Sequence, residues 1–158
     1  MLSRSTLPLS GSLQTDGVRY LNSQDIIELH WAVIHEFGSN QVGAGVVESQ
    51  YGLINTIQRP QVTTFGREAY PSFSDKVAAF TFALLSNKPF RNGNRRLALA
   101  SIFAFCELNE RAVDSRVLDE KAMETVLKRA AGFRELGIPP ENVFRELRDV
   151  MSRAIVAA

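Results

Sequence analysis

The sequence has little of what marks a secreted, membrane-embedded or heavily charged protein. Its 158 residues include one cysteine, Cys106, so no disulfide forms within the chain and a reducing compartment is favoured. No apolar run approaches the roughly 18 residues that a membrane span needs. The first residues contain Arg4 but not the apolar segment of a signal peptide. These absences together predict a cytoplasmic protein that does not enter a membrane.

Charge of one sign is also missing. Lys and Arg together number 18 and Asp and Glu 17, which gives a net charge of +1. This balance argues against binding nucleic acid or an acidic membrane across a whole surface, although it leaves local patches open. Hydrophobic residues make up 45 %, as in an ordinary globular domain, so disorder is excluded as the main state. We expect a flexible arm over 1–17 and a single domain over 18–158.

The spacing of apolar residues predicts a mostly helical chain. Helices are expected over 23–37, 46–58, 72–86, 97–108, 118–131 and 140–156. Ser72 is a candidate cap for the third of these helices, together with Asp75. The stretch 97–108 is apolar on almost every side, which is typical of a helix buried at the centre of a domain. The expected fold class is therefore all-α, a bundle around a buried central helix.

One segment does not follow a helical pattern. Residues 59–72 contain Pro60, Gly66 and Pro71, and between them a run that favours extended chain. That run consists of Val62, Thr63, Thr64 and Phe65. We expect a short extended flap here, either irregular or a short hairpin, that interrupts the bundle.

The turn before the central helix concentrates positive charge. Residues 88–96 include four cations and no acid: Lys88, Arg91, Arg95 and Arg96. The first turn of a helix carries N–H groups without intrahelical acceptors and a partial positive charge. Gly93 lets a ligand approach the backbone closely, and arginine binds phosphate oxygens in a bidentate way. This cationic loop therefore indicates a phosphate site, with a charged capping loop as the alternative.

The residues of the cationic loop, Lys-Pro-Phe-Arg-Asn-Gly-Asn-Arg-Arg, resemble the signature loop of Fic-domain proteins. The likeness is greatest to the death-on-curing (Doc) branch, whose loop reads roughly His-x-Phe-x-Asp-Gly/Ala-Asn-Lys-Arg. The segments 20–37, 52–66, 68–79 and 98–110 resemble the helices and the flap around that loop, so the resemblance covers about 20–150. It implies a mostly α Fic/Doc fold with nucleotide phosphates on the loop.

The resemblance also implies an activity and partners. Typical Fic enzymes transfer AMP from ATP to a protein hydroxyl. Doc-type members transfer the terminal phosphoryl group and act as toxins held by a small antitoxin. The implied ligand is therefore ATP, and the implied partners are an antitoxin and a protein target that the flap clamps as an added strand. The implied phosphate-binding residues are Gly93, Asn94 and Arg96, with Arg95 where Doc proteins have lysine. The charge of the loop adds Arg91 to the expected phosphate-binding residues, and Phe90 is expected to anchor the loop to the bundle.

Two positions depart from the family pattern. Lys88 stands where the family has its general base, a histidine. An ordinary lysine has a pKa of about 10.4, so it is charged at neutral pH and has no lone pair that could accept a proton. Burial or cationic neighbours would have to lower that pKa before the lysine could act as a base. Asn92 stands where the family has the acid that holds Mg²⁺, and an amide brings no negative charge, so Mg²⁺ is expected to bind weakly. We expect weakened or remodelled transfer chemistry; the alternative is a pseudoenzyme that acts as a protein-interaction module.

The other residues that suggest chemistry have structural explanations. We expect His30 to be a satisfied histidine at the core edge and His35 to be exposed, rather than a metal pair. Trp31 is expected in the core. Cys106 is expected to be a packed, inert thiol, and Ser101 to donate to a carbonyl within its helix. Nucleic-acid binding through four charges is a third and weaker alternative, because such contacts fade steeply with salt.

Overall fold

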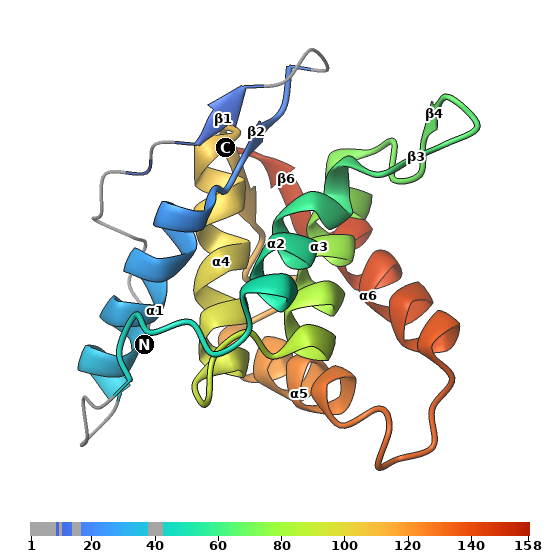
Figure 1. The fold of residues 1–158 in the computed structure, drawn as a ribbon. Helices are drawn as coiled ribbons and strands as arrows, with labels where there is room; N and C mark the ends of the chain where they lie inside the picture. The colour runs from blue at the N-terminus through green and yellow to red at the C-terminus, as the bar shows by residue number, and fades with distance from the viewer. Residues whose placement is uncertain (1–8, 10, 14–16, 38–42) are drawn as a thin grey trace.

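The structure, a computed structural model, describes residues 9, 11–13, 17–37 and 43–158 of the chain (Figure 1). Six α-helices occur in these ranges: α1 Ser23–Phe37, α2 Gln50–Gln58, α3 Phe73–Asn87, α4 Asn94–Leu108, α5 Glu120–Ala131 and α6 Pro140–Ala154. A short 3-10 helix, η1 Arg59–Gln61, follows α2. The strands are β1 Ser12–Leu13, β2 Arg19–Tyr20, β3 Thr63–Thr64, β4 Arg67–Glu68, β5 Arg111–Val113 and β6 Ile155–Ala157. They form three antiparallel pairs, β1 with β2, β3 with β4 and β5 with β6. The expected all-α fold class is confirmed.

Helix α4 lies at the centre of the bundle. Figure 1 shows it between α1 on one side and α3 on the other, and α5 also packs against it. Leu97, Ala98 and Ala104 of α4 have no exposed surface, which confirms the expected buried central helix. The helix begins at Asn94 rather than at residue 97, because Gly93 adopts the left-handed conformation (φ 75°) that ends the loop. Arg95 and Arg96 therefore belong to the first turn of α4.

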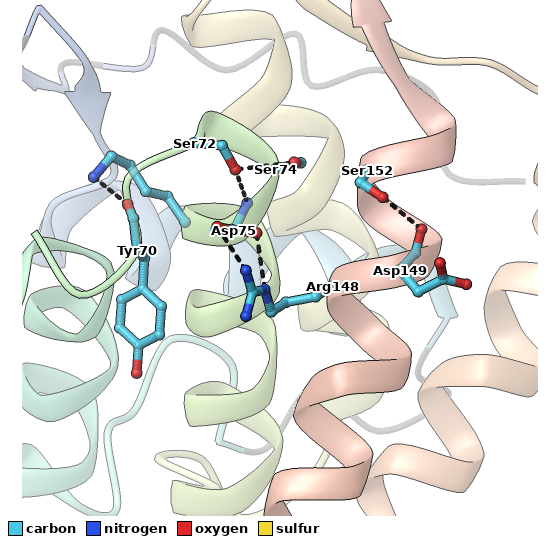
Figure 2. A network of polar contacts seen from close by, with 8 residues as sticks. Tyr70, Ser72, Ser74, Asp75, Arg148, Asp149 and Ser152 are labelled. Atoms are coloured by element: carbon cyan, nitrogen blue, oxygen red, sulfur yellow. Dashed lines mark hydrogen bonds and ion pairs between the residues drawn. The ribbon is translucent and has the colours of Figure 1, made fainter.

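The start of α3 is fixed by a cap and an ion pair. Ser72 Oγ accepts a hydrogen bond from the Asp75 N–H at 3.1 Å, so the expected cap is confirmed. The Asp75 carboxylate also accepts from Nε and Nη2 of Arg148 at 3.0 and 3.3 Å. Figure 2 shows this pair joining α3 to α6. Because Asp75 is buried, its carboxylate depends on this partner, and the pair sets how α6 lies against α3.

The sequence predicted the flap between α2 and α3 correctly, but it did not predict the segment before α2. The flap contains the hairpin β3–β4, whose turn residues Phe65 and Gly66 are both left-handed, and this confirms the expected hairpin. The second helix starts four residues later than expected. Ser49 caps α2 by accepting from the Gly52 N–H at 2.9 Å, and the Glu48 and Ser49 N–H groups donate to the Pro89 carbonyl instead of to a helix.

The expected arm over 1–17 is described only in part. Residues 1–8, 10 and 14–16 lie outside the described residues. Within the described part, β1 pairs with β2, and the Gly11 N–H donates to Asp25 Oδ2 at 3.1 Å. This part of the segment therefore contacts the domain and is not a free arm. In the described ranges, no helix is both long enough and apolar enough to cross a membrane.

Two expectations about aromatic surface are wrong. Trp31 is 52 % exposed, not in the core, because the buried face of α1 is formed by Ile26, His30 and Val33. His35, expected to be exposed, is half-buried, since it packs against Trp31 with the two ring centroids 3.6 Å apart. The pair forms a small aromatic ridge on the outer side of α1.

Ser101 lies fully buried in α4, and its Oγ has no hydrogen-bond partner among the described residues. The expected bond to a carbonyl of its own helix is therefore wrong. An unsatisfied buried hydroxyl costs about 1–3 kcal/mol. We expect Ser101→Ala to leave the free energy of unfolding unchanged or to raise it by up to about 1 kcal/mol, as measured by urea denaturation. A clear loss of stability would instead reveal a hydroxyl contact that matters.

Candidate functional site

The cationic loop turns the chain from α3 into α4. Lys88 ends α3 in the left-handed conformation (φ 45°, ψ 62°), and its N–H donates to the Leu84 carbonyl at 3.0 Å. Its side chain is exposed. Lys88 therefore presents its side chain to solvent at the start of the cationic loop.

Two residues of the loop close it on itself. Asn94 Nδ2 donates to the Phe90 carbonyl at 2.8 Å, and the Phe90 N–H donates to Asn94 Oδ1 at 3.3 Å. The Phe90 side chain is 2 % exposed and belongs to the main core. The Asn94 side chain is thus engaged within the loop, and the Asn94 backbone forms the first residue of α4.

His30 of α1 packs against the cationic loop and forms a hydrogen bond with it. Its ring stacks on Phe90, with ring centroids 3.8 Å apart and an interplanar angle of 11°. The Gly45 N–H donates to His30 Nδ1 at 3.0 Å, so Nδ1 is unprotonated. We assign the proton to Nε2, which lies 3.0 Å from the Asn92 carbonyl and donates to it. His30 is 1 % exposed, and the expectation of a satisfied histidine at the core edge is confirmed.

Stability should depend on pH through this histidine. Burial lowers the pKa of His30 from its ordinary value of 6.5, and the hydrogen bond with Asn92 opposes part of that shift. Below pH 6.5 the unfolded chain binds a proton that the folded chain resists. The contribution of His30 to stability is therefore complete above pH 6.5 and is lost as the pH falls through the folded pKa. Urea denaturation on either side of that pH should show this slope, and His30→Leu should remove it.

The segment that follows α1 forms the other side of the loop. Gly45 reaches His30, while the N–H groups of Glu48 and Ser49 donate to the Pro89 carbonyl at 2.9 and 3.1 Å. Glu48 Oε2 also lies 3.4 Å from Arg91 Nε, with both side chains largely exposed, so this pair contributes little. Sequence reasoning missed this segment, because its glycines signalled only a loop and nothing in the spacing pointed to residues 88–91.

The side chains of Arg95 and Arg96 open onto a groove rather than onto the loop alone. A cavity of about 420 Å³ lies between α4 and α5. It is lined by Arg95, Arg96, Leu99, Lys121, Glu124, Thr125, Leu127 and Lys128. We call it the α4–α5 groove. The part played by α5 was not predicted, because α5 reads in the sequence as an ordinary amphipathic helix.

The flap and the cationic loop lie at opposite ends of α3. The hairpin precedes the first residue of α3 and the loop follows the last, as Figure 1 shows. A helix of 15 residues is about 22 Å long. The proposed flap residues Val62, Thr63, Thr64 and Phe65 are all exposed. The structure therefore does not bring them to the cationic loop.

The donor groups of the loop do not suit Mg²⁺. Asn92 is exposed, and its backbone carbonyl already accepts from His30. Nowhere in the described ranges do three His, Cys, Asp or Glu side chains gather at one point. A hard divalent cation prefers several oxygen ligands that include carboxylates. Positive charge from Lys88 and Arg91 stands where a metal site would need negative charge.

Cys106 takes no part in the site. It is buried in α4, and desolvation raises the pKa of its thiol to about 12, with the nearby Arg111 charge opposing the shift. The thiolate, which is the reactive form, is therefore negligible at neutral pH. The expected inert thiol is confirmed.

Comparison with known proteins agrees with the loop and its setting. A family model described as Fic/DOC family matches residues 20–106, which is more than half of the chain. A curated protein named "Toxin Doc" from Mycolicibacterium smegmatis is 33 % identical over 91 residues, covering 57 % of this chain and 64 % of that protein. No solved structure matches the chain significantly. The matched range holds α1, the flap, α3 and the cationic loop, and the chain belongs to the Fic/DOC family, with its likeness to the Doc branch.

Proposed function

We propose that this chain is a Doc-like toxin whose cationic loop binds the phosphates of a nucleotide, with ATP as the ligand. One observation carries the proposal: the left-handed Gly93 ends the loop directly at the start of α4. The first N–H groups of a helix have no intrahelical acceptors, and the helix dipole adds positive charge there. Arg95 and Arg96, both exposed, belong to the same first turn of α4. A phosphate is the ligand that this combination favours.

The proposed chemistry is transfer from ATP to a protein hydroxyl in a weakened or remodelled form. An exposed lysine, as Lys88 is, suits the binding of phosphate oxygens better than the removal of a proton. Asn92 brings no charge for a metal, and Lys88 and Arg91 would neutralise phosphate instead. Arg95, a cation where Doc proteins have lysine, supports a Doc-like transfer of phosphoryl over a transfer of AMP.

The proposed partners follow from the relative. That protein is named a toxin, and the aligned region covers less than two thirds of its length, so its role comes to this chain as a proposal. We expect an antitoxin that binds this chain. A protein target would contact the exposed hairpin β3–β4, whose tip residue Phe65 is 100 % exposed. Because the hairpin lies at the far end of α3, such a target must extend along the helix to reach the loop.

Calorimetric titration of ATP, with and without Mg²⁺, tests the proposal. Arg95→Gln with Arg96→Gln should weaken ATP binding by about 100-fold, because two charge-assisted contacts to phosphate are removed. Arg145→Gln is the matched control, since Arg145 is an exposed arginine on α6 that belongs neither to the cationic loop nor to the lining of the α4–α5 groove. Binding that ignores Mg²⁺ would agree with the donor set of the loop. Failure of the unaltered protein to bind ATP, or equal affinity in all variants, would refute the phosphate site.

A second function, that of a protein-interaction module without catalysis, is favoured by the exposed Lys88 and the uncharged Asn92. The two functions differ in a cellular experiment. Growth arrest by the expressed protein that disappears with Arg95→Gln and Arg96→Gln supports the phosphate-dependent toxin. Arrest that persists in this variant supports the module.

A further inference from the structure

The α4–α5 groove carries more positive charge than one phosphate needs. Of its eight lining residues, Arg95, Arg96, Lys121 and Lys128 are cations, and Glu124 is the one acid. Within the described part of the chain, neither Lys121 nor Lys128 forms an ion pair with a carboxylate. Next to Lys128 on the chain, Arg129 is paired with Glu146 at 3.0 Å. The side chains of the two lysines are therefore available to an anionic ligand in the groove.

The cations of the groove are spaced along it rather than gathered at one point. Arg95 and Arg96 are neighbours at the first turn of α4. Lys121 and Lys128 are seven residues apart on α5, which is two helical turns, and they lie on one face about 10 Å apart along the axis. The positive charge of the groove therefore extends past the first turn of α4, along the side that faces α5. A chain of linked phosphates has negative charge along its whole length, as the groove has positive charge.

The floor of the groove strengthens these charges. Leu99 of α4 and Leu127 of α5 are 4 % and 2 % exposed, so the groove has an apolar base under an exposed rim of cations. Electrostatic attraction is stronger beside apolar protein than in open water. Glu124, exposed on the rim, opposes a polyanion and limits how tightly the groove holds it.

We infer that the α4–α5 groove binds the polyphosphate chain of the ligand, with one end at the first turn of α4 and the other between Lys121 and Lys128. The inference rests on the proposed phosphate site and names the part of the ligand that lies beyond it. It assigns Lys121 and Lys128 as binding residues and the ligand class as a linear polyphosphate of three or more groups, free or attached to a nucleoside. The groove thus selects for the number of linked phosphates.

The test uses two inorganic probes, orthophosphate and tripolyphosphate, titrated into the unaltered protein and its variants at low salt. Lys121→Gln and Lys128→Gln should each weaken tripolyphosphate binding roughly fivefold and leave orthophosphate binding unchanged. Glu124→Gln should act in the opposite direction and tighten tripolyphosphate binding, because it removes the acid of the groove. Arg145→Gln, which removes a charge elsewhere, should change neither.

The outcomes separate this inference from the proposed function. If the unaltered protein binds neither probe, the phosphate site itself is refuted. If it binds both probes equally, and the three groove variants match Arg145→Gln, the loop site stands and the groove inference fails. A substitution that changes both probes alike would also overturn the inference, because the groove would then act only through the loop. Comparison of ATP with AMP in the same variants shows whether a nucleoside-bound chain is held in the same way.

Discussion

Replacement of His30 by alanine is expected to lower the free energy of unfolding by about 3 kcal/mol, as for other large-to-small changes in a core. The ring is stacked on Phe90 and has almost no exposed surface, so its removal leaves a cavity under the cationic loop. It also leaves the Gly45 N–H and the Asn92 carbonyl without their partner. Urea denaturation at neutral pH measures the loss.

His35→Ala is the control for this prediction. His35 is on the same helix but half-buried, and it contacts the exposed Trp31. Its replacement should cost less than about 1 kcal/mol, as for most surface substitutions. An equal loss in the two variants would mean that the stability arises from helix α1 as a whole, and that the ring of His30 does not hold the loop.

Gly93→Ala is expected to have the second large effect, because two costs coincide at this position. A φ of 75° is unfavourable for any residue with a Cβ, by about 1–2 kcal/mol. The added Cβ would also lie 3.0 Å from Ile34 Cδ1 and 3.6 Å from His30 Nε2. Relief of that contact displaces the end of the Ile34 side chain or the start of α4. We expect a loss of about 2 kcal/mol in unfolding free energy, together with a clear loss of ATP affinity.

Gly137→Ala separates the backbone cost of a positive φ from the cost of the side-chain contact. Gly137 has a similar φ of 69°, but a Cβ there meets no atom within 4 Å. It should therefore show the backbone cost alone and bind ATP as the unaltered protein does. The difference in unfolding free energy between the variants measures the contact with α1. If both variants bind ATP normally, the position of the α4 N-terminus does not determine binding.

Local signals in the sequence were enough for most of the fold. The apolar spacing predicted α1 and α3, since one buried face of a helix repeats every three to four residues. The stretch that is apolar on almost every side predicted α4. Ser72 predicted the start of α3, because a cap is formed by neighbours in the chain. The loop motif itself was visible as a run of charges around Gly93. Each of these features is decided within a few residues.

The rest depends on contacts between distant residues, which one sequence does not reveal. Trp31 was expected in the core as a large aromatic residue, but the face of α1 that packs on α4 excludes it. The Glu48 N–H donates to the Pro89 carbonyl, and Lys121 lines the same groove as Arg95. Both arrangements depend on how the helices pack against one another. The distance between the flap and the loop follows only from the length and direction of α3.

The ion pair between Asp75 and Arg148 also has a consequence for the synthesis of the chain. Its two partners are separated by 73 residues, and α6 packs along α3. As the chain leaves the ribosome, α1 to α4 can assemble first, while the face of α3 that receives α6 waits for about half the chain to be translated. During that interval the carboxylate of Asp75 stays hydrated, and α3 offers an apolar surface to the cell. We therefore expect chaperones to bind the nascent chain at α3, and the packing of α3 to be completed only when α6 has emerged.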